Sequence, residues 1–196
     1  MMRLAVLGST RGTNLTALVE AIRAGTLPAS IELVVSNKAD ALILDKAKQF
    51  GLTHQFVNPH GLSREEYDEQ LSLILLKYRI DLIVLIGYMR ILSPNFVGAW
   101  RDKIINIHPS LLPDFSGLMN IAVHRAVLDS GNKITGCTVH YVTEDVDAGP
   151  ILLQKTCPVL PDDTPERLRT RVQQLEGTAL ADAIATIAEG KRPTFI

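Results

Sequence analysis

The sequence predicts an α/β fold, with a doubly wound, mostly parallel open sheet that ends in a late antiparallel hairpin. Short apolar runs recur along the chain, segments with helical periodicity lie between them, and two later runs are separated only by a turn. Nearly continuous apolar strands that alternate with helices are typical of a parallel sheet covered on both faces. At 196 residues, the chain is expected to form one domain over residues 1–196.

The first half of the chain supplies the expected parallel strands and their helices. The apolar runs expected to be strands are residues 4–7, 31–35, 55–57, 81–86 and 103–107. The amphipathic segments expected to be helices are residues 14–24, 40–50 and 63–78. In the last of these, Ser63 and Glu66 form a capping box. Its apolar stripe consists of Tyr67, Leu71, Ile74, Leu75 and Tyr78.

Arg64 is the unusual residue of this helix. It lies in the first turn, where a cation opposes the helix dipole. Two interpretations are open: Arg64 is a solvated surface side chain, or it is placed there to meet an anion.

The last part of the chain has a different pattern. Residues 135–142 and 151–155 flank the turn-forming segment TEDVDAGP, and we expect them to pair as a hairpin. A final helix is expected to start at Thr164 and Pro165, as N-cap and first helical residue. Gly190 and Pro193 are expected to end it. Its expected buried face consists of Leu168, Val172, Leu175 and Ala179.

The composition favours a small-molecule substrate. With 20 Lys and Arg against 21 Asp and Glu, the net charge is −1, which disfavours binding to nucleic acid or to an acidic membrane surface. Cys137 and Cys157 lie in strand-like runs without a CxxC motif, so we expect neither a metal site nor a disulfide. No signal or membrane-spanning segment is recognised, so a cytoplasmic location is expected. Both a monomer and a homodimer are compatible with the sequence.

The segment GSTRGTNL joins the first strand to the first helix. Gly12, Thr13 and Asn14 would present backbone N–H groups and a hydroxyl at a helix N-terminus, which is a setting that accepts phosphate. The spacing matches neither the dinucleotide nor the nucleoside triphosphate motif. The alternative is an ordinary turn in which Asn14 is the N-cap.

The segment KIINIHPSLLP places an amide and an imidazole together. Asn106 and His108 are two residues apart, so they point to the same face at the carboxyl end of a strand, where open α/β sheets bind ligands. Such a pair can donate hydrogen bonds to an oxygen that becomes negative, and the imidazole can also pass a proton. This chemistry suits acyl or formyl transfer. The alternative is a buried pair satisfied by loop backbone.

A later turn supplies a carboxylate. Asp147 lies next to Ala148 and Gly149, which allow close approach of backbone or ligand, and a carboxylate beside His108 would stabilise the imidazolium. Glu144 and Asp145 are expected to bond to the turn's own backbone. The other histidines are expected to be structural: His54, His60, His124 and His140. Nucleophilic catalysis is disfavoured, because neither cysteine has an evident base partner and no GxSxG motif is present.

Five segments together resemble the phosphoribosylglycinamide formyltransferases of purine synthesis, in the same order: GSTRGTNL, SNKADA, GYMRILSP, NIHPSLLP and GCTVHYVTEDVDAGPILLQ. The resemblance covers nearly the whole chain. It implies a Rossmann-like formyltransferase fold and transfer of the formyl group of 10-formyltetrahydrofolate, a co-substrate, to the amine of phosphoribosylglycinamide, without a metal. It also implies that Asn106, His108 and Asp147 surround the reacting carbon, and that Asp147 orders a proton-shuttling water.

The resemblance assigns binding residues as well. The phosphoribosylglycinamide phosphate would lie on Gly12, Thr13 and Asn14, supported by Gln173 and Glu176 of the last helix. The folate pocket would match Arg64, Met89, Arg90, Ile91, Leu92, Asn106, Thr143, Glu144, Asp145, Val146 and Asp147.

Two segments depart from the family pattern. The phosphate turn is poorer in glycine than usual and contains Arg11, a cation that could assist or crowd the phosphate. The stretch SGLMNIAVHRAV after the catalytic strand also differs, and we expect a mobile flap at residues 114–124.

Rival functions come from two classes. Methionyl-tRNA formyltransferase and formyltetrahydrofolate hydrolase share the Asn-x-His and the later Asp, but each carries a further domain that this chain is not expected to contain. The other alternative is a catalytically silent module that binds folate or a sugar phosphate.

Overall fold

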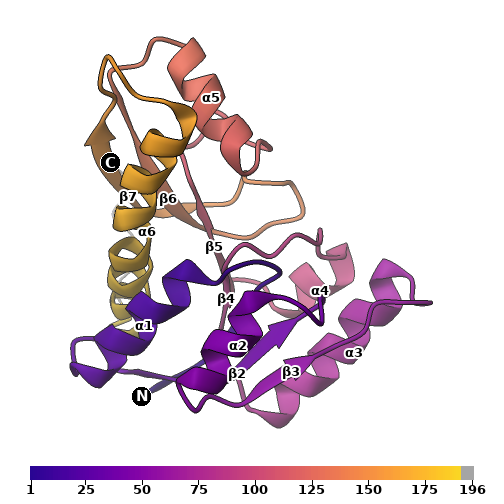
Figure 1. The fold of residues 1–196 in the computed structure, drawn as a ribbon. Coiled ribbons are helices and arrows are strands. Elements are labelled where there is room, and N and C mark those ends of the chain that lie inside the picture. The colour runs from indigo at the N-terminus through magenta and orange to yellow at the C-terminus, as the bar shows by residue number, and fades with distance from the viewer. Residues whose placement is uncertain (191–196) are drawn as a thin grey trace.

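The computed structural model describes residues 1–190, in which the strands form one seven-stranded sheet (Figure 1). The strand order is β3-β2-β1-β4-β5-β6-β7. The strands β1 to β5 pair in parallel, whereas β6 runs antiparallel to both β5 and β7. The strands are β1 (Met2–Leu7), β2 (Ala29–Ser36), β3 (His54–Phe56), β4 (Leu82–Leu85), β5 (Ile104–His108), β6 (Ile134–Tyr141) and β7 (Ile151–Pro158). The predicted mostly parallel sheet with a late hairpin is therefore confirmed.

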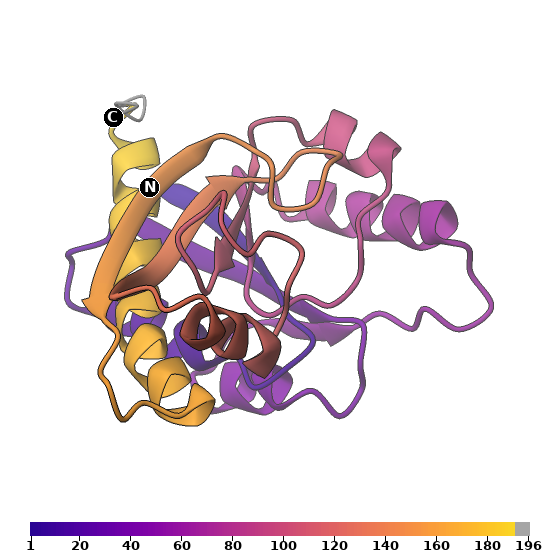
Figure 2. The same ribbon diagram turned by 90° about the horizontal axis from the view of Figure 1, so that it is seen from above.

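Helices cover both faces of the sheet (Figure 2). They are α1 (Thr13–Arg23), α2 (Leu42–Gln49), α3 (Arg64–Lys77), α4 (Pro94–Ala99), α5 (Ile121–Asp129) and α6 (Pro165–Ala188). The helices α1, α2 and α6 share one apolar core with the sheet, and α3 and α4 share a second core on the other face. The helix α5 packs against α6.

The two cores explain why the parallel strands are apolar at nearly every position. In β1, Leu4 and Val6 face the α1 side, and Ala5 and Leu7 face the α3 side; all four are fully buried. Successive strand residues point to opposite faces of the sheet, so a strand covered on both faces needs apolar residues at both its odd and its even positions.

The helix ends follow the capping signals in the sequence. Ser63 Oγ accepts a bond from Glu66 N at 3.2 Å, and Glu66 Oε2 accepts one from Ser63 N at 2.8 Å, which confirms the capping box. Thr164 caps α6, and Pro165 is its first residue. The helix ends at Ala188, two residues before Gly190, which has a φ of 68°. Pro193, also expected to stop it, lies outside the described residues.

Three expectations for local structure were wrong. First, Asn14 is not an N-cap: Gly12 caps α1 in the left-handed conformation, with φ 59°, and Asn14 lies inside the helix. Second, residues 121–124 of the expected flap form the first turn of α5, so only the preceding residues are a loop. Third, His124 is not on a helix surface but is 1% exposed. The short helix α4, capped by Ser93, was not predicted at all.

The topology places the candidate site. Starting from β1, the chain winds outward through β2 and β3 and then returns to add β4 on the other side of β1. The loops after β1 and β4 therefore diverge at this switch point, which opens a crevice at the carboxyl ends of the strands. Among the described residues, none of the helices is long and apolar enough to cross a membrane.

Candidate active site

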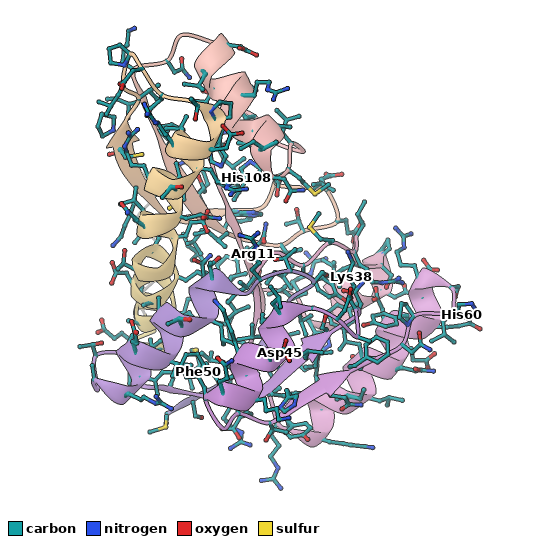
Figure 3. All side chains as sticks on the ribbon, viewed as in Figure 1. Arg11, Lys38, Asp45, Phe50, His60 and His108 are labelled. Carbon is teal, nitrogen blue, oxygen red and sulfur yellow. The ribbon has the colours of Figure 1, made fainter. Side chains whose placement is uncertain are left out.

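A cavity of about 780 Å³ lies at the carboxyl ends of β1, β4 and β5. This volume is in the range of pockets that hold a small organic molecule. The cavity brings together nearly all the residues predicted for the site: Gly12, Thr13, Asn14, Met89, Arg90, Ile91, Leu92, Asn106, His108, Thr143, Glu144, Asp145, Val146, Asp147, Gln173 and Glu176. They come from segments that lie far apart in the sequence, so the fold alone gathers them. In Figure 3, Arg11 and His108 lie in the central region between the helices.

One end of the cavity is formed by the start of α1. Gly12 adopts φ 59°, and a Cβ there would lie 2.4 Å from Ile43 Cγ1, so only glycine fits this turn. The first turn of α1 contains no acidic residue. The positive end of the helix dipole is therefore not neutralised by an acidic residue of α1 itself, which favours an anion at this end of the cavity.

The last helix closes the same end. Glu176 is 8% exposed, and its Oε2 accepts a 2.7 Å hydrogen bond from Asn14 Nδ2. Burial raises the pKa of Glu176, and the bond from Asn14 offsets only part of this effect. Gln173 lies three residues earlier, on the same side of α6, and is exposed toward the cavity.

The middle of the cavity holds the predicted triad. Asp147 Oδ2 lies 3.2 Å from His108 Nδ1, and the backbone N–H of Gly117 donates to the same oxygen at 2.9 Å. Burial alone would raise the pKa of Asp147, but the hydrogen bonds from His108, His140 and Gly117 lower it far below its usual range. Asp147 is therefore a carboxylate at neutral pH.

Both ring nitrogens of His108 face oxygens that can only accept. The Nδ1 atom faces the carboxylate of Asp147, and Nε2 lies 3.2 Å from the carbonyl oxygen of Phe115. Because both contacts require an N–H, the geometry favours the doubly protonated imidazolium. His108 is only 3% exposed, so this cation depends on Asp147 for charge compensation.

His140 joins the amide of the site to its carboxylate, contrary to the expectation that it is merely structural. It lies on β6 directly opposite Asn106 on β5. Its Nε2 is 3.3 Å from Asn106 Nδ2 and 3.5 Å from Asp147 Oδ1, and its Nδ1 donates to the Tyr141 carbonyl at 2.9 Å. Neutral His140 can thus accept a bond from Asn106, whereas protonated His140 donates to Asp147.

The turn that carries Asp147 is held by backbone contacts. Asp147 adopts φ 55°, and the Asp145 carbonyl accepts bonds from Thr143 Oγ1 and Ala148 N at 3.2 and 3.5 Å. A Cβ at Gly149 would lie 1.8 Å from the Tyr141 carbonyl oxygen, so this residue allows the close backbone approach expected of it. The turn can therefore aim the Asp147 carboxylate inward while Glu144 and Asp145 stay exposed at the cavity wall.

The other end of the cavity follows β4 and is more apolar. The backbone N–H of Met89 donates to Ser9 Oγ at 2.9 Å, which ties this loop to the end of β1. The Arg90 guanidinium lies 4.3 Å from the centre of the Tyr67 ring, a cation–π contact beneath the loop. Ile91 is 62% exposed and Leu92 is buried, so apolar side chains line both the mouth and the wall.

Some predicted residues are not brought into the cavity. Arg64 does not belong to its lining; its Nε pairs with Glu65 at 3.2 Å, so its role as a ligand contact stays a prediction. His54 and His60 are also outside the lining, and Figure 3 shows His60 at an edge of the molecule far from His108. Among residues 1–190, no group of His, Cys, Asp and Glu side chains could hold a metal ion.

Sequence reasoning assigned no functional role to several residues that line the cavity, among them His140, His124 and Arg169. His140 could have been found from the strand register, since it pairs directly with Asn106. The other two lie on helices α5 and α6, and only the packing of these helices brings them to the cavity.

Comparisons with known proteins identify the family of this chain. Residues 2–184 match the family model described as formyl transferase. The phosphoribosylglycinamide formyltransferase of Escherichia coli is 39% identical over 97% of this chain and 89% of its own length. A crystal structure of glycinamide ribonucleotide transformylase 1 from Symbiobacterium toebii superimposes with a TM-score of 0.92, at 42% identity, over 97% of this chain and 89% of that one.

A longer relative matches equally well. The human trifunctional purine biosynthetic protein adenosine-3 is 44% identical over 96% of this chain. The chain spans only 18% of that protein's length.

Proposed function

Because this chain belongs to the formyl transferase family, we propose that it transfers the formyl group of 10-formyltetrahydrofolate to the amine of phosphoribosylglycinamide. The products are the N-formyl ribonucleotide and tetrahydrofolate, and the step belongs to purine biosynthesis. The observation that carries the proposal is the contact between the Asp147 carboxylate and His108, with Asn106 linked to the same carboxylate through His140. We propose that residues 1–196 act as a single formyltransferase domain.

The reaction needs a group that stabilises negative charge on the formyl oxygen. When the substrate amine attacks the formyl carbon, this oxygen becomes an oxyanion. The Asn106 amide and the His108 imidazolium are the donors proposed to stabilise it. In the structure His108 Nε2 is bonded to the Phe115 carbonyl, so this bond must be exchanged for one to the substrate oxygen.

Proton movement completes the transfer. The attacking amine loses a proton, and N10 of the folate gains one as the bond between N10 and the formyl carbon breaks. Ionised Asp147 keeps His108 protonated until the oxyanion forms, and the imidazolium can then supply or relay the proton. A water beside Asp147 would carry away the proton that the attacking amine loses.

The two ends of the cavity suit the two substrates. The α1 N-terminus, with Asn14, Gln173 and Glu176, is the proposed site of the phosphate. Residues 89–92 and the turn at residues 143–147, which also line the cavity, are the proposed folate site. This arrangement would direct the amine and the formyl group toward the same point. We propose that the reaction needs no metal and that the enzyme is cytoplasmic, acting as a monomer or a homodimer.

A direct assay tests this function. The purified chain is incubated with 10-formyltetrahydrofolate and phosphoribosylglycinamide, and tetrahydrofolate formation is followed. We expect turnover that depends on both substrates and falls about 10²-fold or more in His108→Ala, the scale for loss of an oxyanion donor. His60→Ala is the matched control, because His60 is exposed and lies outside the cavity. Binding of both ligands without turnover would instead support the catalytically silent module.

A further inference from the structure

One side of α6 presents three polar residues to the cavity, not two. Arg169, Gln173 and Glu176 are spaced at i, i+4 and i+7, which places them along one face of a helix, and all three line the cavity. Gln173 and Glu176 are already assigned to the proposed phosphate site. Arg169 lies one turn nearer the start of the helix and brings a positive charge to the same wall.

The guanidinium of Arg169 is unpaired, unlike those of its neighbours on α6. Arg167 Nη1 bonds to Asp162, and Arg171 bonds to both carboxylate oxygens of Asp163. By contrast, Arg169 Nε is buried without a hydrogen-bond partner, and Arg169 forms no ion pair with any residue in the described part of the chain. A buried guanidinium N–H without an acceptor is costly, so this arrangement is typical of a site completed by an anionic ligand.

His124 is a second unsatisfied group in this wall. It lies on α5, is 1% exposed, and its Nδ1 has no hydrogen-bond partner. Burial, together with the nearby charges of Arg169 and His108, lowers the pKa of His124 to about 4. His124 is therefore neutral at pH 7 and can donate one N–H to a ligand without adding a charge.

The negative charges at this end of the cavity also favour a nearby cation. A phosphate monoester carries up to two negative charges, and the buried Glu176 carboxyl lies next to Asn14 in the proposed phosphate site. If Glu176 is ionised, its charge opposes the phosphate. The α1 N-terminus contributes only a partial positive charge, Arg11 is exposed at the cavity, and Lys46 Nζ bonds to the Gly12 carbonyl at 3.5 Å. A guanidinium on the same helix as Glu176, with several N–H donors, is suited to offset its charge.

We propose that Arg169 is a direct ligand of the substrate phosphate and acts together with the α1 N-terminus. This inference rests on the proposed function and deepens it by adding a charged residue to the ribonucleotide end of the cavity. It predicts a specific loss of affinity for the phosphate-bearing substrate when the charge is removed. The formyl donor, which binds at the other end of the cavity, should be unaffected.

The kinetic test uses three arginine variants of the full chain. Arg169→Gln should raise the KM for phosphoribosylglycinamide about 10- to 100-fold, the scale for loss of a charge-assisted hydrogen bond. The KM for 10-formyltetrahydrofolate should stay within about twofold, and Arg169→Lys should restore part of the loss because it keeps the charge. Arg167→Gln, on the same helix but bonded to Asp162, is the control. If Arg169→Gln raises the ribonucleotide KM no more than Arg167→Gln does, the proposal is wrong.

A binding test separates this proposal from the proposed function. Inorganic phosphate is titrated into each protein by calorimetry, and the imidazole signals of His124 are followed by NMR. We expect phosphate to bind more weakly to Arg169→Gln by the same factor as the KM, and the pKa of His124 to rise in this variant, since a nearby positive charge is gone. If the chain shows no formyl transfer but phosphate binding still depends on Arg169, the proposed function alone fails. If transfer is normal and phosphate binding is unchanged in Arg169→Gln, only the role of Arg169 is overturned.

Discussion

Asp147 Oδ2 lies 3.2 Å from His108 Nδ1, although the two residues lie on opposite sides of the segment that includes α5 and β6. Asp147 reaches this position from a turn, with φ 55°, and a backbone N–H of the loop before α5 holds the same oxygen. The carboxylate therefore fixes both the orientation and the charge of the imidazole. The Asp147 carboxylate thus connects three segments: strand β5, the loop before α5, and the turn between β6 and β7.

The first prediction concerns the charge of Asp147. Asp147→Asn keeps the shape of the side chain but removes the negative charge that compensates the buried His108. We expect kcat to fall about 10²-fold or more, with both KM values within about threefold, because the imidazolium is needed chiefly in the transition state. Steady-state kinetics with each substrate varied in turn measure this. A wild-type kcat would remove Asp147 from the mechanism.

The second prediction concerns His140, which links Asn106 to Asp147. His140→Ala leaves the Asn106 amide and one Asp147 oxygen without their shared partner. We expect kcat to fall about tenfold, less than for Asp147→Asn, since one hydrogen bond to a charged group is lost rather than the charge itself. A positioning role also predicts a changed pH profile of kcat, which a purely structural loss would not produce. His54→Ala, at a position exposed on β3, serves as the control, and an equal effect in the two variants would contradict the role of His140.

The third prediction concerns the pH dependence of stability through Glu176. Burial raises the pKa of Glu176 in the folded state above its unfolded value. The contribution of protonated Glu176 to the free energy of unfolding is therefore complete below the unfolded pKa, about 4.3, and is lost as the pH rises through the folded pKa. Glu176→Gln keeps an acceptor for Asn14 Nδ2 but cannot ionise. We expect its free energy of unfolding to exceed that of the wild type at pH 8, by about 1.4 kcal/mol for each unit of pKa shift, and the difference to vanish near pH 4.

Urea denaturation of both proteins at pH 4, 6 and 8 measures this difference. A difference between wild type and Glu176→Gln that stays constant with pH would show that Glu176 does not titrate in this way.

The parallel half of the fold could be predicted from the sequence because its strands and its helix starts each have a local sequence signal. Buried strands such as β1 are continuous apolar runs, and helix starts such as that of α3 carry their own capping residues. The shorter elements could not be predicted in this way. The helix α4 has only 6 residues, which is too short for a periodic signal. The helix α5 begins without a side-chain capping bond, so its start carries no capping signal.

The candidate site was predictable where its residues share one segment. Asn106 and His108 are alternate residues of one strand, so their common orientation follows from strand geometry. His140 depends on the pairing register of β5 with β6, and Arg169 depends on how α6 packs, and neither is encoded locally. Asp147 lies in the turn between β6 and β7, so its position beside His108 was only a hypothesis from the residues, and the resemblance to a family supported it.

The last prediction concerns Gly149, which controls the turn carrying Asp147. A Cβ at this position would lie 1.8 Å from the Tyr141 carbonyl oxygen, which is backbone and also accepts the bond from His140 Nδ1. Gly149→Ala must therefore displace the end of β6 and with it His140. We expect a loss of about 2 to 3 kcal/mol in the free energy of unfolding, together with reduced kcat. The measurements are urea denaturation and the formyl transfer assay.

Gly25→Ala separates this steric effect from ordinary backbone strain. Gly25 has φ 72° and nothing within 4 Å of an added Cβ, so its substitution costs only the left-handed conformation, about 1 kcal/mol. No such strain applies at Gly149, for which only the close contact is expected to matter. Gly25→Ala should leave kcat unchanged, because the glycine follows α1 on the side away from the cavity residues. If Gly149→Ala is no less stable than Gly25→Ala and retains full kcat, the turn tolerates the displacement, and His140 does not depend on the Tyr141 carbonyl for its position.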